Sequence, residues 1–318
     1  MSGNRWSRRS FLGTMAAGGL ALGTGVRPAF ALAGGQPKPG KIGDFKISLA
    51  EWSLHKALRE KDAKITNLDF PRIARDEYGI EGVEYVNQFF KDKAHDAAYL
   101  KDLNKRAADN GVTNVLIMID GEGDLSLADA AKRNQAVENH KKWVDAAATL
   151  GCHAIRINTG SNYGPDKTDD AAAGCSAVAE YGAKHKIHII CENHGGPSSD
   201  PDSLIALVKA VNNPMFGTLP DFGNFPKHKN NNTYAIDVYD AIARLMPYAK
   251  GVSAKSYDFA SDGTESNLDF ARILKIVTDS GYNGWVGIEY EGSRLTEPEG
   301  IRATKKLLEK LRGADYRG

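Results

Sequence analysis

The sequence contains few cysteines and shows no excess of charge of either sign. Cys152, Cys175 and Cys191 are an odd number, and no CxxC or zinc-finger spacing is present in the 318 residues. We therefore expect buried thiols rather than a disulfide framework. Lysine and arginine total 41 against 40 aspartates and glutamates, so the net charge of +1 gives no basis for a nucleic-acid partner.

The sequence also lacks the signatures of several large enzyme classes. It has no GxSxG, HExxH, Walker or Rossmann fingerprint, which argues against the common serine hydrolases, zincins, kinases and nicotinamide enzymes. The composition, with 42% hydrophobic and 25% charged residues, is that of an ordinary globular protein. A chain of this length can bury a large core without disulfides or structural metals.

The first 33 residues have the features of an export signal. Arg8 and Arg9 precede Ser-Phe-Leu, a Gly/Ala-rich stretch follows, and residues 29–31 form an A-x-A cleavage pattern. The paired arginines resemble a twin-arginine signal, while an ordinary secretory signal and an uncleaved anchor are the alternatives. The stretch is too short and too rich in glycine for a membrane span, so we expect no stable membrane insertion after cleavage. We therefore predict a periplasmic protein exported by the twin-arginine machinery.

The rest of the chain alternates between strand-like and helix-like segments. Residues 34–45 are rich in glycine, proline and lysine and indicate a linker, residues 46–312 carry the alternation, and residues 313–318 are expected to form a tail. Eight apolar runs begin at Ile47, Gly82, Thr113, Ala154, His188, Phe216, Gly251 and Trp285. This pattern predicts an α/β protein whose single domain is a (β/α)8 TIM barrel. An open doubly wound sheet is the alternative, although no GxGxxG follows the first run.

Three carboxylates stand at the ends of apolar runs. Glu192, Asp221 and Glu289 follow the fifth, sixth and eighth runs, and in a barrel all strands end at the same mouth. Carboxylates brought together in this way repel one another unless a cation neutralises them. Oxygen ligands favour Mg²⁺ or Mn²⁺ over Zn²⁺ or Co²⁺. The alternative is that these groups are solvated acids or ion-pair partners of Lys255 and Arg156.

The order of four short motifs resembles the sugar phosphate isomerase/epimerase family, the xylose-isomerase-like TIM barrels. The motifs are ENHGG from Glu192, PDFGNF from Pro220, SAKSYDF from Ser253 and GIEYEG from Gly287. The resemblance implies one divalent metal ion held by Glu192, Asp221 and Glu289, together with a histidine. Ser253 stands where the family usually has that histidine, so the fourth ligand would be water or His194.

The resemblance also implies a reaction. Members of the family move a proton on a hydroxy-ketone sugar through a cis-enediolate, with two glutamates as the groups that remove and return the proton. Glu192 and Glu289 take these catalytic roles here. Lys255 would steady the enediolate oxygen, or would instead pair with Asp221 or Asp258.

Further polar residues at the strand ends are predicted to contact the substrate. These residues are Trp52, His55, Glu84, Arg156, Asn158, His194 and Asn224. His140 falls in a helical segment and is expected to be structural. The segment 120–124, DGEGD, resembles a calcium loop only loosely and is expected to be a solvated loop.

We therefore expect a metal-dependent isomerase or epimerase that acts on a small sugar or keto-sugar. Two other functions are compatible with the same residues. One is a keto-sugar lyase or hydratase that uses the same enolate chemistry, and the other is a non-catalytic, exported carbohydrate-binding barrel. Analogy of fold alone does not decide among the three.

Overall fold

The computed structural model describes residues 36–229 and 233–318. The predicted export signal, residues 1–33, lies outside these residues. In the part of the chain that is described, no helix combines the length and the apolar character needed to cross a membrane.

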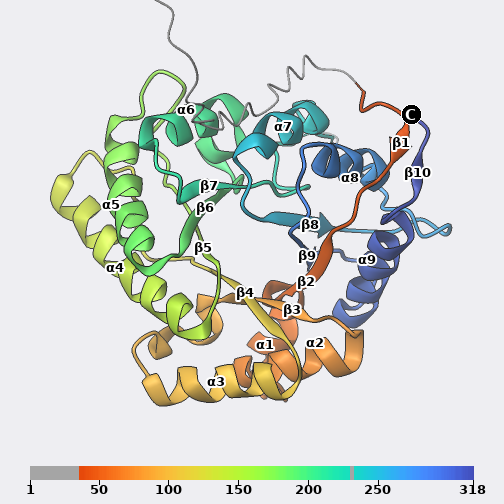
Figure 1. Cartoon of the computed structure of the whole chain (residues 1–318), viewed down its shortest axis with the longest axis horizontal. Coiled ribbons are helices and arrows are strands. Elements are labelled where there is room, and N and C mark those ends of the chain that lie inside the picture. The colour runs from red at the N-terminus through yellow and green to blue at the C-terminus, as the bar shows by residue number, and fades with distance from the viewer. Residues whose placement is uncertain (1–35, 230–232) are drawn as a thin grey trace, which may run out of the picture. The chain divides into compact units, whose positions relative to one another are not determined.

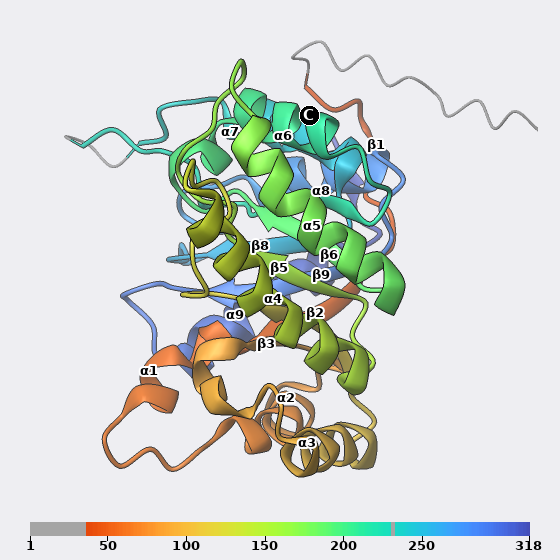
Figure 2. The same ribbon diagram turned by 90° about the vertical axis from the view of Figure 1, so that its left-hand side faces the viewer.

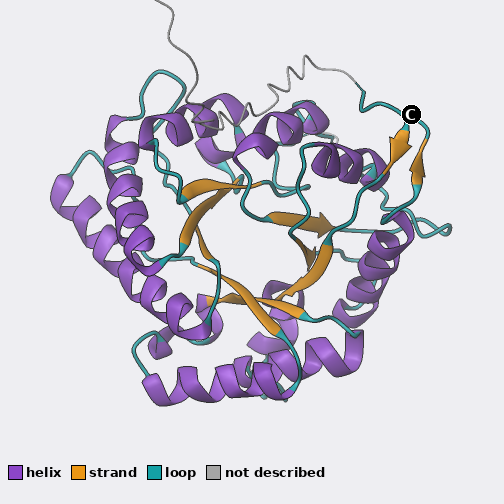
Figure 3. Cartoon of the chain, in the orientation of Figure 1, coloured by secondary structure: helices purple, strands orange, loops and turns teal. Residues whose placement is uncertain are grey.

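Eight parallel strands form a ring that is surrounded by helices (Figures 1 and 3). The strands of the ring are β2 (Lys46–Ala50), β3 (Gly82–Val86), β4 (Thr113–Met118), β5 (Ala154–Ile157), β6 (His188–Glu192), β7 (Phe216–Leu219), β8 (Val252–Ser256) and β9 (Trp285–Tyr290). Each strand begins within one residue of the start predicted from the apolar runs. The predicted α/β barrel is therefore confirmed.

The helices that follow the strands cover the outside of the ring, as the view from the side also shows (Figure 2). The α-helices are α1 (His55–Arg59), α2 (Phe70–Tyr78), α3 (Ala97–Asp109), α4 (Ala130–Leu150), α5 (Asp169–His185), α6 (Pro201–Val211), α7 (Val238–Leu245), α8 (Phe270–Asp279) and α9 (Glu297–Leu311). Short 3₁₀ segments lie at Glu51–Leu54, Asn67–Asp69, Asn87–Phe89, Lys91–Lys93, Gly196–Ser199 and Met246–Tyr248.

The ring closes between β7 and β8. The continuous sheet runs in the order β7-β6-β5-β4-β3-β2-β9-β8. Backbone hydrogen bonds of 2.9 to 3.0 Å, among them those from Phe222 N to Ser253 O and from Ser253 N to Pro220 O, join its two ends. These bonds place the segment that follows β7 directly beside β8, so Asp221 lies next to Ser253.

Local sequence signals explain where the longest helix begins and ends. The side chain of Asp129 accepts hydrogen bonds from Ala131 N and Lys132 N, which caps the amino terminus of α4. Gly151 ends the helix with a φ of 74°, a left-handed conformation that glycine adopts without a steric cost.

Apolar side chains fill the barrel below the mouth. Val86, Leu116, Met118 and other strand residues form a buried cluster inside the ring, and Trp285 packs against it. Trp285 begins β9, at the end of the barrel where the strands start. A Cβ atom on Gly82 would lie 2.5 Å from the Trp285 ring, so glycine leaves the room that the indole occupies. The barrel therefore has a packed floor at the end opposite its mouth.

The two ends of the described chain pair beside the barrel. Strand β1 (Gly40–Lys41), within the predicted linker, runs antiparallel to β10 (Asp315–Tyr316), within the predicted tail. Ile42 N donates to Ala314 O over 2.9 Å, and Ile42 is almost completely buried. The segments that flank residues 46–312 thus form a two-stranded sheet of their own.

Candidate functional site

Three buried carboxylates meet at the mouth of the barrel. Glu192 is the last residue of β6, Asp221 follows β7, and Glu289 is the penultimate residue of β9. One oxygen of each lies within 4.8 Å of one oxygen of each of the others, and all three side chains are buried. The side chains therefore converge as their places at the strand ends predict.

Asp221 is held by uncharged donors. Its Oδ1 accepts hydrogen bonds from Gly223 N at 2.8 Å and Asn224 N at 2.7 Å, and its Oδ2 accepts one from Ser253 Oγ at 2.6 Å. Among the described residues, no cation lies within ion-pair distance of this carboxylate. Burial raises the pKa of Asp221 well above its usual range, and the neighbouring acids raise it further, while Lys255 opposes them.

Glu192 is shared between an amide and an arginine. Its Oε1 accepts a hydrogen bond of 2.7 Å from Asn224 Nδ2. Its Oε2 lies 2.8 Å from Nε of the buried Arg156, but the two groups are not oriented for a hydrogen bond and neither atom has another hydrogen-bond partner among the described residues. Burial opposes the charge of Arg156, but Glu192 and Asp120 raise the pKa of its guanidinium.

Glu289 also has a buried cation beside it, a lysine from β8. The register of β8 and β9 sets Lys255 beside Glu289, and Lys255 Nζ donates to Glu289 Oε1 over 2.8 Å. Glu289 Oε2 has no hydrogen-bond partner in the described structure. Lys255 Nζ also lies 2.8 Å from Glu291 Oε2, so its partners are these two glutamates rather than Asp258, which pairs with Arg294. Burial would lower the pKa of Lys255, but the surrounding acids raise it well above its usual value.

The charge balance and the free oxygens of this group fit a divalent cation. Five carboxylates that these contacts link face two cations, so full ionisation would leave three negative charges in excess, and burial and this repulsion raise the pKa values of Asp221 and Glu289. The carboxylates are Asp120, Glu192, Asp221, Glu289 and Glu291, and the cations are Arg156 and Lys255. Glu192 Oε2 and Glu289 Oε2 are buried acceptors with lone pairs that no protein hydrogen bond uses. A cluster of this composition is stabilised by a hard, oxygen-binding cation.

Glu84 lies deeper in the barrel than the group of three. It is in the middle of β3, and its Oε1 accepts a hydrogen bond of 2.6 Å from Ser48 Oγ. Burial raises the pKa of Glu84 to about 8, so the carboxyl group is protonated at neutral pH. A Cβ on Gly287 would lie 2.5 Å from both of its oxygens. Glycine at this position of β9 therefore makes the space for Glu84.

An aromatic rim follows β2 and β3. The rings of Trp52 and His55 stack with centroids 5.0 Å apart, and Phe89 lies 6.2 Å from Trp52. The guanidinium of Arg59 lies 4.6 Å above the Trp52 ring, and Trp52 Nε1 donates to Glu291. Of these residues, Phe89 and Arg59 were not predicted, because Phe89 lies beyond its strand and Arg59 reaches the rim from α1.

Residues 120–124 form a loop, as predicted, but the prediction that the loop is solvated is wrong for Asp120 and Glu122. Asp120 accepts hydrogen bonds of 2.8 Å from Arg156 Nη1 and Asn158 Nδ2, and Glu122 accepts one from the buried Trp143. Burial alone would raise the pKa of Asp120, but Arg156 lowers it to about 2. Asp120 comes two residues after the end of β4, so it obeys the same strand-end rule that singled out the three acids of the mouth.

The structure gives several predicted substrate contacts other partners. Arg156 and Asn158 bind Asp120, and Asn224 binds Glu192. The side chain of His194 is exposed, and the group of potential metal ligands found in the described chain does not include it. His140 is buried and its Nδ1 contacts Ala136 O at 2.7 Å, in agreement with the expected structural role. All three cysteines are buried, free thiols, as predicted.

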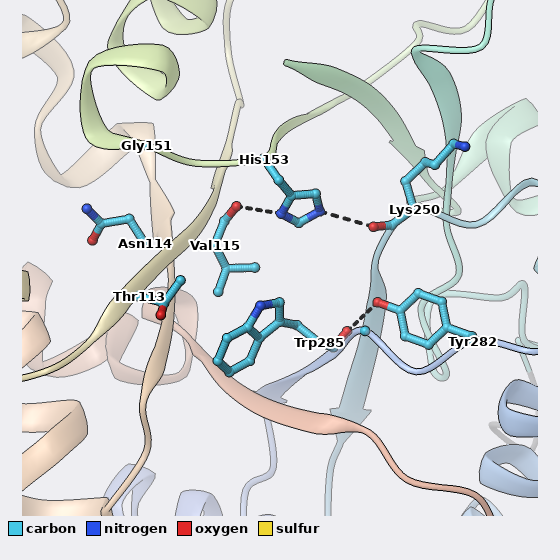
Figure 4. Close-up of a pocket in the computed structure, with 9 residues that line it drawn as sticks. Thr113, Asn114, Val115, Gly151, His153, Lys250, Tyr282 and Trp285 are labelled. Carbon is cyan, nitrogen blue, oxygen red and sulfur yellow. Dashed lines mark hydrogen bonds between the residues drawn. The ribbon is translucent and has the colours of Figure 1, made fainter. Parts of the chain in front are cut away.

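A cavity of about 280 Å³ lies at the opposite end of the barrel, where β4, β5, β8 and β9 begin. The ring nitrogens of His153 contact Val115 O at 2.8 Å and Lys250 O at 3.1 Å, and Tyr282 donates to Trp285 O (Figure 4). No carboxylate is among its lining residues, and His153 and Tyr282 bind backbone oxygens. The chemistry-bearing residues are therefore at the mouth and not here.

A comparison with protein-family models identifies a family for this fold. The model of the xylose isomerase-like TIM barrel family matches residues 73–311. The chain belongs to this family. The match begins within α2, runs to the end of α9 and so includes Glu192, Asp221 and Glu289 of this xylose isomerase-like barrel. A comparison of the sequence with curated proteins finds no match.

Solved structures share the fold at low sequence identity. D-psicose 3-epimerase from Clostridium cellulolyticum, solved with D-tagatose, is 13% identical, with 85% of this chain and 100% of that chain covered at a TM-score of 0.67. A xylose isomerase-like TIM barrel protein from Mycobacterium smegmatis, solved in complex with magnesium, is 15% identical over 86% and 98% of the chains, at 0.63. The probable 3-DHS dehydratase of Bacillus anthracis is 15% identical over 83% and 99%, also at 0.63. At these identities the likeness shows the fold alone.

Proposed function

We propose that this xylose isomerase-like barrel is a metal-dependent isomerase or epimerase of a small hydroxy-ketone sugar. The observation that carries the proposal is the set of three buried carboxylates within 4.8 Å of one another, two of which keep an oxygen free of hydrogen bonds. Three acids placed so closely in a buried site are costly unless a cation joins them. The epimerases of the same fold make a sugar the natural candidate substrate.

Glu192, Asp221 and Glu289 would hold the metal ion. Their donor atoms are all carboxylate oxygens, which suit Mg²⁺ or Mn²⁺ better than Zn²⁺ or Co²⁺. A divalent cation supplies Lewis acidity, which lowers the free energy of an oxyanion that develops on a bound sugar. Ser253, at the position of the family's histidine, donates a hydrogen bond to Asp221 and orients that carboxyl group.

Glu192 and Glu289 are the residues proposed to move the proton. They come from β6 and β9, on either side of the two strands that carry Asp221 and Ser253. One glutamate removes the proton next to the carbonyl group, and the other returns a proton to the cis-enediolate from its own side. A carboxylate in such a position contributes a rate factor of roughly 10²–10⁴.

Lys255 is proposed to stabilise the negative charge that develops on the substrate. Its ammonium group lies between Glu289 and Glu291, both at 2.8 Å. Because the surrounding acids raise its pKa, Lys255 keeps its charge at neutral pH. A fixed positive charge in a site with little water is worth more than the same charge in solvent.

Solvent-deuterium exchange tests the proposal. Wild-type protein, loaded with Mg²⁺ or Mn²⁺ and incubated in D₂O with a panel of keto-sugars, is expected to incorporate deuterium next to the carbonyl group. Glu192→Gln and Glu289→Gln are each expected to abolish this exchange, because an amide does not accept the proton. Glu51→Gln is the matched control, since Glu51 is buried directly after β2 but binds Val86 N and Asn67 rather than the group of three.

The outcomes separate the three functions. Exchange without elimination products supports the isomerase or epimerase. Elimination or hydration products contradict the isomerase and support a lyase or hydratase. Sugar binding without exchange at any metal concentration contradicts both enzymes and supports a binding protein. Exchange at the wild-type rate in either glutamine variant contradicts the assignment of the proton-transferring residues.

We also propose that the protein reaches the periplasm through the twin-arginine machinery. The supporting feature is the pair Arg8 and Arg9 before a short apolar stretch. Replacing both with lysine is expected to retain the protein in the cytoplasm of a bacterial host, as measured by cell fractionation. Export at the wild-type level would favour the ordinary secretory route.

A further inference from the structure

Two buried cations at the mouth are each shared between an inner and an outer acid. Arg156 places Nε 2.8 Å from Glu192 Oε2 and Nη1 2.8 Å from Asp120 Oδ1. Lys255 Nζ lies 2.8 Å from both Glu289 Oε1 and Glu291 Oε2. The inner acids belong to the group of three, whereas the outer acids do not.

The sharing affects what the inner acids can bind. A buried cation with a single carboxylate partner pairs fully with it and competes with any metal ion for the same oxygens. A second carboxylate on the cation takes up part of its charge and fixes the direction of its donors. Arg156 thus directs Nη1 to Asp120, and its Nε is left facing Glu192 Oε2 without the alignment of a hydrogen bond.

Asp120 is itself anchored from two neighbouring segments, the one after β5 and the 3₁₀ segment Asn87–Phe89. Its Oδ1 accepts from Asn158 Nδ2 at 2.8 Å, and its Oδ2 accepts from Gln88 Nε2 at 3.0 Å. Its backbone is fixed on both sides by Asn87, whose amide group bonds to Asp120 N and Asp120 O at 3.0 and 2.9 Å. Because these bonds hold Asp120 in place, the position of Asp120 sets the direction in which Arg156 Nη1 points.

Glu291 has the corresponding place on the other side of the mouth. Trp52 Nε1 donates to its Oε1, while its Oε2 takes Lys255. Glu289 is left with one oxygen on Lys255 and one oxygen that accepts no hydrogen bond. The two sides of the mouth therefore repeat one arrangement, with an arginine on β5 and a lysine on β8.

We propose that Asp120 and Glu291 are positioning residues of the metal centre, which hold Arg156 and Lys255 away from full pairing so that Glu192 and Glu289 remain available to the cation. The inference rests on the proposed function, because it takes the group of three as the cation site. Loss of either outer acid lets its cation pair fully with the inner acid and also removes a negative charge near the metal. Both effects weaken cation binding.

Calorimetric titration of metal-free protein with Mg²⁺ or Mn²⁺ tests the inference. Asp120→Asn is expected to weaken binding by about 10–100-fold, the usual effect of losing a partner of a metal ligand. Asp120→Glu keeps the charge and is expected to recover most of the affinity. In the exchange assay, the Asp120→Asn protein is expected to need more cation for half-maximal rate and to approach the wild-type rate at saturation.

Asp258→Asn is the matched control. Asp258 also follows a strand at the mouth, but its partner Arg294 is largely exposed and touches none of the three inner acids. Its substitution removes the same charge and is expected to leave cation affinity unchanged. Glu291→Gln is the second test, because Glu291 is partly exposed and its side-chain shape is kept. Glu291→Gln is expected to weaken cation binding, and it tests the inference independently if the Asp120 variant does not fold.

The results distinguish this inference from the proposed function. If the wild-type protein binds neither cation, the metal centre itself is wrong. If the wild-type protein binds the cation and both Asp120→Asn and Glu291→Gln bind it equally well, the positioning role is wrong and the metal centre stands. A lower saturated exchange rate with unchanged cation affinity would instead place the outer acids in contact with the substrate.

Discussion

Replacing Asp221 with asparagine is expected to change stability in opposite directions with and without a cation. At 4.8 Å and an effective dielectric constant of about 20, each pair of carboxylates repels by ~3.5 kcal/mol. Asp221 forms two such pairs, and attraction to Lys255 offsets a large part, so at a pH at which Asp221 is ionised, removing its charge is expected to stabilise the metal-free protein by ~1–3 kcal/mol. The asparagine keeps an oxygen for Gly223 N and Asn224 N and a group that can bond to Ser253.

The opposite effect is expected when the cation is present. A ligand at about one hundred times its dissociation constant stabilises the folded state by about 2.7 kcal/mol, and the variant is expected to lose most of this gain. Urea unfolding of both proteins, in chelator and in excess Mg²⁺ or Mn²⁺, measures the two effects. In chelator, the advantage of the variant is expected to grow with pH. Because the pKa of Asp221 is raised in the folded wild-type protein, the folded state keeps a proton that the unfolded chain releases, and the wild-type protein loses stability as the pH rises.

Ser253→Ala is the control for the loss of a hydrogen bond at the same place. It removes the donor to Asp221 Oδ2 and leaves all charges unchanged. It is expected to cost about 1–2 kcal/mol in both conditions and to keep the response to the cation. The reasoning is refuted if Asp221→Asn responds to the cation as the wild-type protein does, or if it is less stable than the wild-type protein in chelator.

Three further predictions concern the barrel and its ends. Gly287→Ala places a Cβ 2.5 Å from the oxygens of Glu84 and is expected to lower the free energy of unfolding by ~1–3 kcal/mol. In a double-mutant cycle measured by urea unfolding, Glu84→Ala is expected to relieve this cost, and additive costs would contradict the clash. Burial raises the pKa of Glu51 to about 8, so between pH 4.5 and 8 the folded protein keeps a proton that the unfolded chain releases, and stability falls by up to about 1.4 kcal/mol per pH unit. Glu51→Gln is expected to flatten this pH dependence of unfolding, and an unchanged slope would be evidence against the buried, protonated acid. Tyr316→Ala removes a buried ring of β10 and is expected to lower the free energy of unfolding by about 3 kcal/mol, whereas a loss below about 1 kcal/mol would mean that β10 contributes little.

The barrel could be predicted because its strands are covered on both faces. Such strands are continuously apolar in sequence, as in residues 115–119 (VLIMI), and glycines such as Gly151 mark the ends of the helices between them. The three acids of the mouth could be predicted for a related reason. A barrel brings the ends of strands that are far apart in sequence to one mouth. The positions of Glu192, Asp221 and Glu289 after their strands were therefore enough to predict that the three side chains converge.

The partners of these acids depend on packing that a one-dimensional pattern does not contain. Asp120 was assigned to a solvated loop because it stands among glycines and acids, but Arg156, 36 residues later, reaches it across the mouth. The alternative to a role of Lys255 at the enediolate oxygen was a pair with Asp221 or Asp258, whereas the register of β8 and β9 sets Lys255 beside Glu289. Pairing between β1 and β10 joins the first and last described segments, a contact between residues separated by almost the whole chain.

The pairing of β1 with β10 also has a practical consequence. Gly40 precedes the start of β2 and Tyr316 follows α9, so both lie toward the floor that Trp285 closes and away from the carboxylates. A tether, a fusion partner or a solid support joined at residue 318, or at residue 36 of a chain shortened to begin there, is therefore expected to leave substrate access open. Because Gly40 and Tyr316 pair side by side, a short linker between residues 36 and 318, in a chain shortened to begin at residue 36, would give a circular permutant in which new termini are placed in an outer loop.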